Sequence, residues 1–127
     1  MNVFENLVTS ERKISLGQFA DYLKDSEKKM GEVAKDSEFI PDFLGLLDKV
    51  DRDVLDFKTQ EMIYLALAIA LRCEGCIITH GQRAAEAGVT LKEAKSVIEI
   101  ATMMQGGPGL SYGVKAYQVM KEFASDN

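Results

Sequence analysis

Several residue types are scarce in this chain of 127 residues, and their scarcity excludes whole classes of protein. Tryptophan is absent, proline and cysteine occur twice each, and there is a single histidine. Two cysteines cannot build the disulfide framework of a small secreted domain. With so little proline and a hydrophobic fraction of 46%, the composition is not that of a disordered chain. We therefore predict one packed domain over residues 1–127.

Basic residues are also in the minority. Fifteen Lys and Arg stand against twenty Asp and Glu, for a formal charge of −5. This balance repels phosphate groups, so we expect neither nucleic acid nor a membrane surface as a partner. The longest apolar run, 62–71, is far shorter than the roughly 20 residues of a membrane-spanning helix. The first residues lack the pattern of a secretory signal, and we expect a cytoplasmic location.

No segment alternates apolar and polar residues in the manner of a β-strand. Apolar residues recur at helical spacing instead, which predicts an all-α fold, a bundle of about five or six helices. The first predicted helix runs from Ser15, its cap, to Ala34. A second, shorter helix is predicted to begin with Pro41 at the N1 position and to end near Val50.

The segment that begins near Asp56 and runs to Leu71 is apolar on nearly every face after Glu61, a pattern typical of a helix that is buried all round. In a short chain, such a helix is most easily buried at a subunit interface or in the centre of a bundle. We therefore expect an oligomer. The next helix is predicted from Cys73 to Ala87, with Gly88 ending it.

Thr90 and Glu93 have the spacing of a capping box, which predicts a further helix from Leu91. The glycine-rich segment 106–109 should end that helix as an interhelical turn, and the last helix is predicted over 110–123. This glycine-rich segment lacks the Lys and Ser or Thr of a phosphate-binding loop. No cofactor is expected.

The residues with distinctive chemistry lie between positions 61 and 80. Cys73 and Cys76 on the first turn of a helix would have Cα atoms about 5 Å apart, within disulfide range. A helix N-terminus favours the thiolate, and Cys76 is the predicted reactive sulfur. His80 follows Cys76 by one helical turn, so its imidazole could exchange a proton with the thiol.

Glu61 precedes Cys73 by twelve residues, which on one unbroken helix would separate them by about 18 Å. A role for Glu61 therefore requires a turn near Cys73 to Gly75. Antiparallel helices would then bring the carboxylate toward His80, and Glu61, His80 and Cys76 would form one chain of proton transfer.

Two other interpretations fit the same residues. Thiolates and imidazole at this spacing suit zinc, with Glu61 as a fourth ligand, although a second ligand pair is missing. Alternatively, the cysteines are buried and inert, and His80 is merely packed. Glu61 also has a structural explanation as an acidic residue in a first helical turn. Tyr64 is expected in the core rather than in a pocket.

Taken together, these motifs resemble a known family. Glu61, the sequence Cys73-Glu74-Gly75-Cys76 with His80 four residues later, and the Ala-rich helix before Gly88 are similar to the alkylhydroperoxidase D branch of the carboxymuconolactone decarboxylase family. The resemblance covers about residues 55–109. It implies an all-helical fold assembled as homo-trimers or homo-hexamers. It also implies a peroxidase or disulfide reductase with a hydroperoxide or disulfide substrate and an external dithiol reductant.

The resemblance further implies a role for each site residue. Cys76 matches the cysteine that becomes a sulfenic acid, Cys73 the partner that resolves it, and His80 with Glu61 the proton relay. One position departs from the pattern, because alkylhydroperoxidase D has a second histidine directly before the later cysteine, where this chain has Gly75. The decarboxylase that names the family lacks the cysteine pair, so lactone decarboxylation is the less expected activity.

Overall fold

The computed structural model describes residues 17–124, and the elements in this range are all helical, which confirms the all-α class. In chain order they are α2 (Gln18–Ala34), α3 (Phe39–Gly45), the 3-10 helix η1 (Leu46–Lys49), α4 (Phe57–Ala70), α5 (Glu74–Glu86), α6 (Leu91–Gln105) and α7 (Gly107–Phe123). None of these helices is long and apolar enough to cross a membrane. Ser15 and the first residues, from which a cytoplasmic location was expected, lie outside the described residues.

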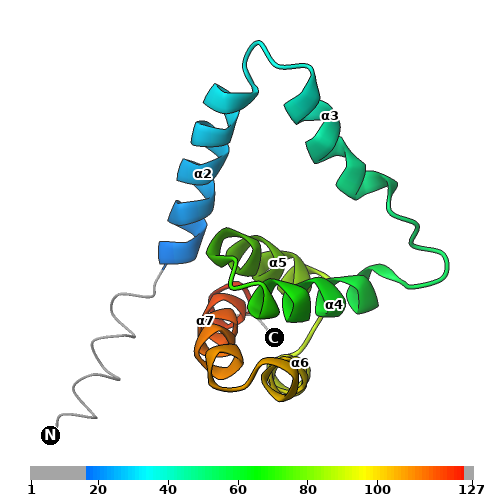
Figure 1. Ribbon diagram of the computed structural model, residues 1–127, viewed down its shortest axis with the longest axis vertical. Coiled ribbons are helices and arrows are strands. Elements are labelled where there is room, and N and C mark those ends of the chain that lie inside the picture. Colours follow the sequence, from blue (N-terminus) through cyan, green and yellow to red (C-terminus); the bar gives the residue numbers. More distant parts are fainter. Residues whose placement is uncertain (1–16, 125–127) are drawn as a thin grey trace, which may run out of the picture.

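The helices form two parts (Figure 1). Helices α4 to α7 pack against one another, and we call them the bundle. Residues 17–56, with α2, α3 and η1, form an arm that extends away from the bundle and returns to it at the start of α4. The arm therefore lies against the bundle chiefly at its two ends.

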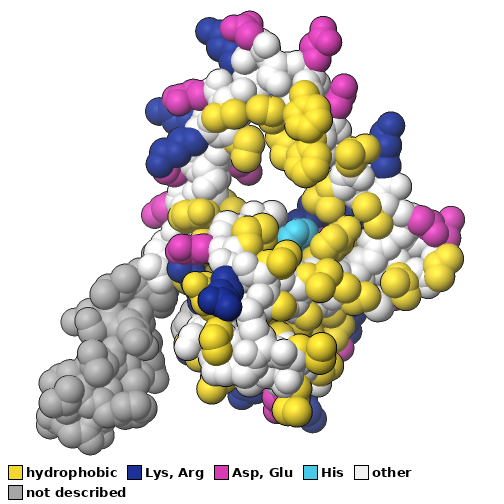
Figure 2. Space-filling view, in the orientation of Figure 1, with side chains coloured by type: hydrophobic (Ala, Val, Ile, Leu, Met, Phe, Trp, Pro, Cys, Tyr) yellow, Lys and Arg dark blue, Asp and Glu magenta, His cyan; other side chains and the backbone are white. Residues whose placement is uncertain are grey.

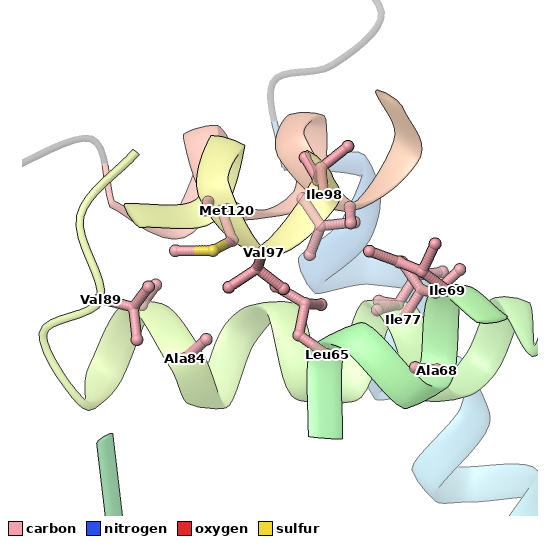
Figure 3. Packing of buried hydrophobic residues seen from close by; sticks show 14 of the residues in the cluster. Leu65, Ala68, Ile69, Ile77, Ala84, Val89, Val97, Ile98 and Met120 are labelled. Carbon is pink, nitrogen blue, oxygen red and sulfur yellow. The ribbon is translucent and has the colours of Figure 1, made fainter. Parts of the chain in front are cut away.

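The hydrophobic core lies inside the bundle. Its largest fully buried apolar side chains come from α4, α5, α7 and the α5–α6 connection: Leu65, Ile69, Ile77, Ile78, Val89, Val119 and Met120. Figure 3 shows Leu65 of α4 and Val97 of α6 pointing into the same space. Four helices that share one apolar interior give the bundle a framework on which side chains from α4 and α5 can be held in register.

The chain reverses direction between α4 and α5 within three residues. Arg72 has a φ of 55°, its N–H donates to Ile69 O, and the N–H of Cys73 donates to Ala68 O at 3.1 Å. This is the Schellman arrangement, usually built on glycine, and it satisfies the last carbonyl groups of α4. The turn that a role for Glu61 requires is thus present, slightly before the predicted position.

The predicted helix signals at α4, α5 and α6 agree with the structure. Asp56 caps α4 by accepting a hydrogen bond from Thr59 N–H at 2.8 Å, and this bond lowers the pKa of the Asp56 carboxyl below its ordinary value. Gly88 follows α5 with a φ of 88°. The capping box of Thr90 and Glu93 is complete, and its backbone hydrogen bond lowers the pKa of Glu93.

Three predicted helix starts are wrong. Helix α2 begins at Gln18, with Gly17 as its N-cap residue at a φ of 80°, rather than directly after Ser15. Helix α3 begins at Phe39 rather than at Pro41, because Ser37 Oγ accepts a hydrogen bond from Ile40 N–H at 3.2 Å and organises the first turn there. The proline lies within that first turn, where its missing N–H needs no partner. Helix α7 begins at Gly107 rather than at residue 110, and Gly106 alone, with a φ of 78°, separates it from α6.

The reason for the early start of α7 is close packing. A Cβ on Gly109 would lie 2.9 Å from Thr102 Cα, so only glycine lets the first turn of α7 approach the backbone of α6. Pro108 is tolerated there because it lies in the first helical turn. The predicted interhelical turn over 106–109 is therefore largely helix.

Many apolar side chains of the arm are exposed. Phe39 and Phe43 stack on each other but remain mostly in contact with solvent, as do Val33, Leu46 and Val54. Figure 2 shows hydrophobic side chains on α2 and α3 along the sides that face each other. The arm thus carries apolar surface that one chain leaves uncovered.

Helix α4 has an uncovered face as well. Ile63, Leu67 and Leu71, spaced by one helical turn, are each about half exposed or more. The prediction that this helix is buried all round is therefore wrong for the single chain. The other face of α4, with Glu61, Leu65 and Ile69, is fully buried against the bundle.

Candidate active site

The two cysteines meet at the start of α5. Cys73 is the N-cap residue, and Cys76 lies on the first helical turn, where its N–H donates to Cys73 Sγ at 3.3 Å. The sulfurs are joined in a disulfide with a Cα–Cα separation of 5.2 Å, in agreement with the spacing expected from the sequence. Both residues are partly exposed. The pair is accordingly neither a long-range staple nor sealed in the core.

Glu61 and His80 are in direct contact. His80 Nδ1 lies 2.7 Å from Glu61 Oε2, and the Glu61 side chain is only 1% exposed. A carboxylate accepts hydrogen bonds, so Nδ1 is the donor and Nε2 is the ring nitrogen that is left for other chemistry. Figure 1 shows α4 and α5 side by side, the arrangement that brings a residue of each helix together.

Tyr64 lies on the same site, contrary to its expected place in the core. Its ring stacks on the imidazole of His80, with ring centroids 4.6 Å apart and planes 18° from parallel. Tyr64 also borders a hollow of about 370 Å³, whose remaining lining comes from the end of the arm and from α4: Val50, Asp51, Val54, Leu55, Gln60 and Ile63. The stack fixes the plane of the imidazole, and Tyr64 connects it to an apolar hollow.

Arg83 is a site residue that the sequence reasoning missed. Its Nε donates to Glu61 Oε1 at 2.9 Å, so that both oxygens of this buried carboxylate are bonded. Its guanidinium carbon lies 5.4 Å from the centre of the Phe57 ring. The available signal was its position, since Arg83 follows His80 by three residues and shares its helix face.

The structure brings the predicted residues into two groups. Cys73 and Cys76 form one group, and Glu61 and His80 form the other, with His80 one helical turn beyond Cys76 on α5. Within residues 17–124, no group of three or more His, Cys, Asp or Glu side chains is arranged to hold a metal ion. The zinc interpretation therefore finds no ligand cluster in this part of the chain.

Comparisons with known proteins agree with this picture. The sequence profile of the carboxymuconolactone decarboxylase family matches residues 38–118. An uncharacterized protein of Cupriavidus necator is 32% identical over 58% of this chain and 66% of its own length. A protein encoded in the cox locus of Paracoccus denitrificans is 32% identical over 73% of this chain and 86% of its own.

A solved structure is similar over most of the chain. It is the apo form of a carboxymuconolactone decarboxylase family protein from Legionella pneumophila, with a TM-score of 0.78 and 33% identity. The similarity covers 85% of this chain and 98% of the Legionella chain. The helical arrangement described above is therefore also found in a crystal structure.

Proposed function

Since the chain belongs to the carboxymuconolactone decarboxylase family, we propose that it is a thiol-dependent oxidoreductase that reduces hydroperoxides or disulfides with Cys73 and Cys76. The match to the family profile confirms the family that the sequence motifs indicated. The single observation that carries the proposed activity is the cysteine pair at the head of α5, one turn before a histidine held by a buried glutamate. We further propose that residues 1–127 act as one domain.

The first step starts from the reduced pair. His80 Nε2 accepts the proton of the Cys76 thiol, and the first turn of α5 stabilises the resulting thiolate. The thiolate attacks the distal oxygen of a hydroperoxide, so that the S–O bond forms as the O–O bond breaks. The proton on His80 passes to the departing alkoxide, which leaves as an alcohol, and Cys76 becomes a sulfenic acid.

In the second step, the Cys73 thiol condenses with the Cys76 sulfenic acid, releasing water and forming the disulfide that the structure contains. An external dithiol then reduces this disulfide by thiol exchange and is itself oxidised. Because the Cα atoms are already 5.2 Å apart, the pair can open and close with little backbone movement. A small disulfide could enter the same cycle by exchange with Cys76.

Glu61 has an orienting role in this scheme. Its contact with Nδ1 fixes the tautomer of His80 and leaves Nε2 free of hydrogen, which is the form that acts as a base. The stack with Tyr64 fixes the ring plane. The apolar hollow that Tyr64 borders offers space for the organic part of a substrate.

We also propose that the protein acts as a homo-trimer or homo-hexamer. The uncovered apolar faces of the arm and of α4 support self-association, because burying exposed apolar surface between subunits is favourable. Sedimentation velocity of the full chain tests this part of the proposal. A single species with the mass of one chain at micromolar concentration would contradict it.

Thiol mapping tests the proposed activity most directly. Reduced protein is treated with an organic hydroperoxide, and the peptide with Cys73 and Cys76 is examined by mass spectrometry. We expect a mass loss of two hydrogens in the pair, one equivalent of alcohol per disulfide, and recovery of both thiols with a dithiol. A peptide that keeps both thiols while the peroxide persists would contradict the proposal.

Single-cysteine variants separate the two roles. Cys76→Ser should abolish peroxide consumption, whereas Cys73→Ser should consume one equivalent and stop at a sulfenic acid or a mixed disulfide. His80→Ala should slow the reaction most at neutral pH and least in alkali, where a thiol ionises without a base. Equal residual turnover in both cysteine variants would overturn the assigned roles.

A further inference from the structure

Arg83 contacts the proton relay without belonging to the motif that defines it. Its Nε and the Nδ1 of His80 bind the two different oxygens of the Glu61 carboxylate, at 2.9 and 2.7 Å. Building on the function proposed above, we propose that Arg83 is a positioning residue that keeps His80 a neutral base by balancing the charge of Glu61.

The argument begins with the burial of Glu61. An ionised carboxylate that is 1% exposed is strongly destabilising unless a cation compensates it. Two side chains in contact with it could do so: Arg83, which is always charged, and His80, which is charged only when protonated. With Arg83 in place, the carboxylate is balanced, and the imidazole needs no positive charge.

The consequence for His80 follows from its two nitrogens. A neutral ring donates to Glu61 through Nδ1 and keeps its lone pair at Nε2, where a proton can be accepted. A protonated ring would also bind Glu61, but it would carry hydrogen at both nitrogens and could not act as a base. The charge of Arg83 thus determines whether the buried carboxylate of Glu61 favours the neutral or the protonated ring of His80.

The geometry holds Arg83 in this role. Arg83 and His80 lie one turn apart on α5, and their common partner Glu61 lies one turn after Phe57 on α4. The guanidinium also lies against the Phe57 ring, a cation–π contact that restricts the side chain. The Arg83 side chain is 24% exposed, so its charge is only partly screened by water.

The other polar groups around α5 do not take over this task. Arg52 lies over the Phe57 ring at 4.6 Å, and no ion pair joins it to Glu61.

Glu74 of α5 is paired with Lys115 of α7. Tyr64 of α4 presents its ring to the imidazole, and the hydroxyl of Tyr22 of α2 lies near Gly75. In residues 17–124, the ion pairs of Glu61 are those with His80 and Arg83.

Removal of the charge of Arg83 forces a proton into the site. If the proton goes to the imidazole, His80 becomes a cation. If it goes to Glu61, the acid donates to Nδ1, and the ring hydrogen moves to Nε2. Both outcomes remove the lone pair at Nε2. Each therefore differs from the parent in which ring nitrogens carry hydrogen.

Nitrogen-15 NMR of the oxidised full-length protein reads this state directly, because the chain has a single histidine. In the parent at pH 7 we expect the neutral ring with hydrogen on Nδ1. Arg83→Gln keeps a hydrogen-bond donor without the charge, and we expect the charged ring or the Nε2–H tautomer. Arg83→Lys, which keeps the charge, should resemble the parent. Arg52→Met is the matched control and should also resemble it.

Kinetics provide a second measurement. In Arg83→Gln the acidic limb of the rate of peroxide consumption should move to higher pH, with a loss of about tenfold at pH 7 that recovers in alkali. The KM for the peroxide should change little. A merely structural role would lower the rate by the same factor at every pH.

The outcomes separate clearly. A folded Arg83→Gln protein with the parent's tautomer and charge would overturn the proposal, and so would unfolding of both the Gln and the Lys variants. An unfolded Gln variant beside a folded Lys variant with the parent's tautomer would support it. If the parent consumes no peroxide, the proposed function fails, but the NMR result still decides the role of Arg83.

Discussion

The bundle and the arm are built from similar helices but differ in what their apolar residues do. In the bundle, Leu65 is completely buried, and Gly81 of α5 and Gly109 and Gly113 of α7 lie against neighbouring helices. In the arm, Val54 is 85% exposed, and a Cβ on Gly31 or Gly45 would meet nothing within 4 Å. The difference teaches that the bundle provides most of the stability and holds the candidate site, whereas the arm exposes apolar surface.

The largest expected effect is on the core. Leu65→Ala should lower the free energy of unfolding by about 2–5 kcal/mol, because it removes buried contacts and leaves a cavity in the bundle. Val54→Ala in the arm should change it by less than about 0.5 kcal/mol. Urea unfolding of the dilute protein measures both. A similar loss in both variants would mean that the arm is as tightly packed as the bundle.

Glycine substitutions should give the next largest difference. Gly109→Ala places a Cβ 2.9 Å from Thr102 Cα, a backbone atom that cannot move aside, so we expect a loss of about 1–3 kcal/mol. Gly31→Ala lies within α2 in open space and should stabilise the helix by roughly 0.5–1 kcal/mol. The changes in the free energy of unfolding should therefore have opposite signs, and equal signs would contradict the packing described here.

Glu122 connects the two parts. Its carboxylate on α7 accepts hydrogen bonds from the N–H groups of Phe19 and Ala20, at 3.2 and 2.9 Å, and so acts as the cap that Gly17 cannot supply. Glu122→Ala should cost about 0.5–2 kcal/mol of local stability in α2. Hydrogen exchange should show faster exchange in the first turn of α2 with little change in α4 and α5. A uniform change across the chain would show that the two parts unfold together.

The smallest effect concerns pH. Hydrogen bonds lower the pKa of Asp56 below 3.8 and that of Glu93 below 4.5 in the folded protein. Their stabilising contributions are therefore present above those ordinary values and are lost as the pH falls through the lower folded values. Asp56→Asn with Glu93→Gln should flatten the loss of stability between pH 5 and pH 3.

The arm provides the control for this titration. Lys29 pairs with Asp25 on exposed α2, and the hydrogen bond to Asp25 raises the pKa of Lys29. Its contribution is present below the ordinary Lys value of 10.5 and is lost as the pH rises through the folded value. Lys29→Met should leave the acid titration unchanged, since an exposed pair contributes little. A change between pH 5 and pH 3 would be unexpected.

Most of the correct predictions concern places where one residue and its near neighbours decide the structure. The capping box at Thr90 and Glu93 and the terminating glycine at Gly88 are of this kind. So is the spacing of Cys73 and Cys76 on the first turn of α5. In each case the hydrogen bonds join residues within one helical turn, so their pattern is visible along the chain.

Most of the errors occur where distant residues decide, and the exception is the start of α3, which depends on the local hydrogen bond between Ser37 and Ile40. Gly109 belongs to a helix rather than to a turn because the backbone of α6 lies against it. Arg72 takes a left-handed backbone conformation that favours glycine, so its residue type does not predict the reversal of the chain after α4. The contact of Glu61 with His80 could be stated only as a condition on such a turn, and its bond to Arg83 was not foreseen.

The sequence by itself determined the all-α class, the end of α5 at Gly88, the capping box of α6 and the cysteine pair one turn before His80, because these depend on contacts between near neighbours. Only the tertiary structure decided that Glu61 is buried between His80 and Arg83 and that the apolar surface of the arm stays uncovered. The physical reason is that the partners of a buried charge are chosen by how two helices pack, and helix packing depends on the whole core.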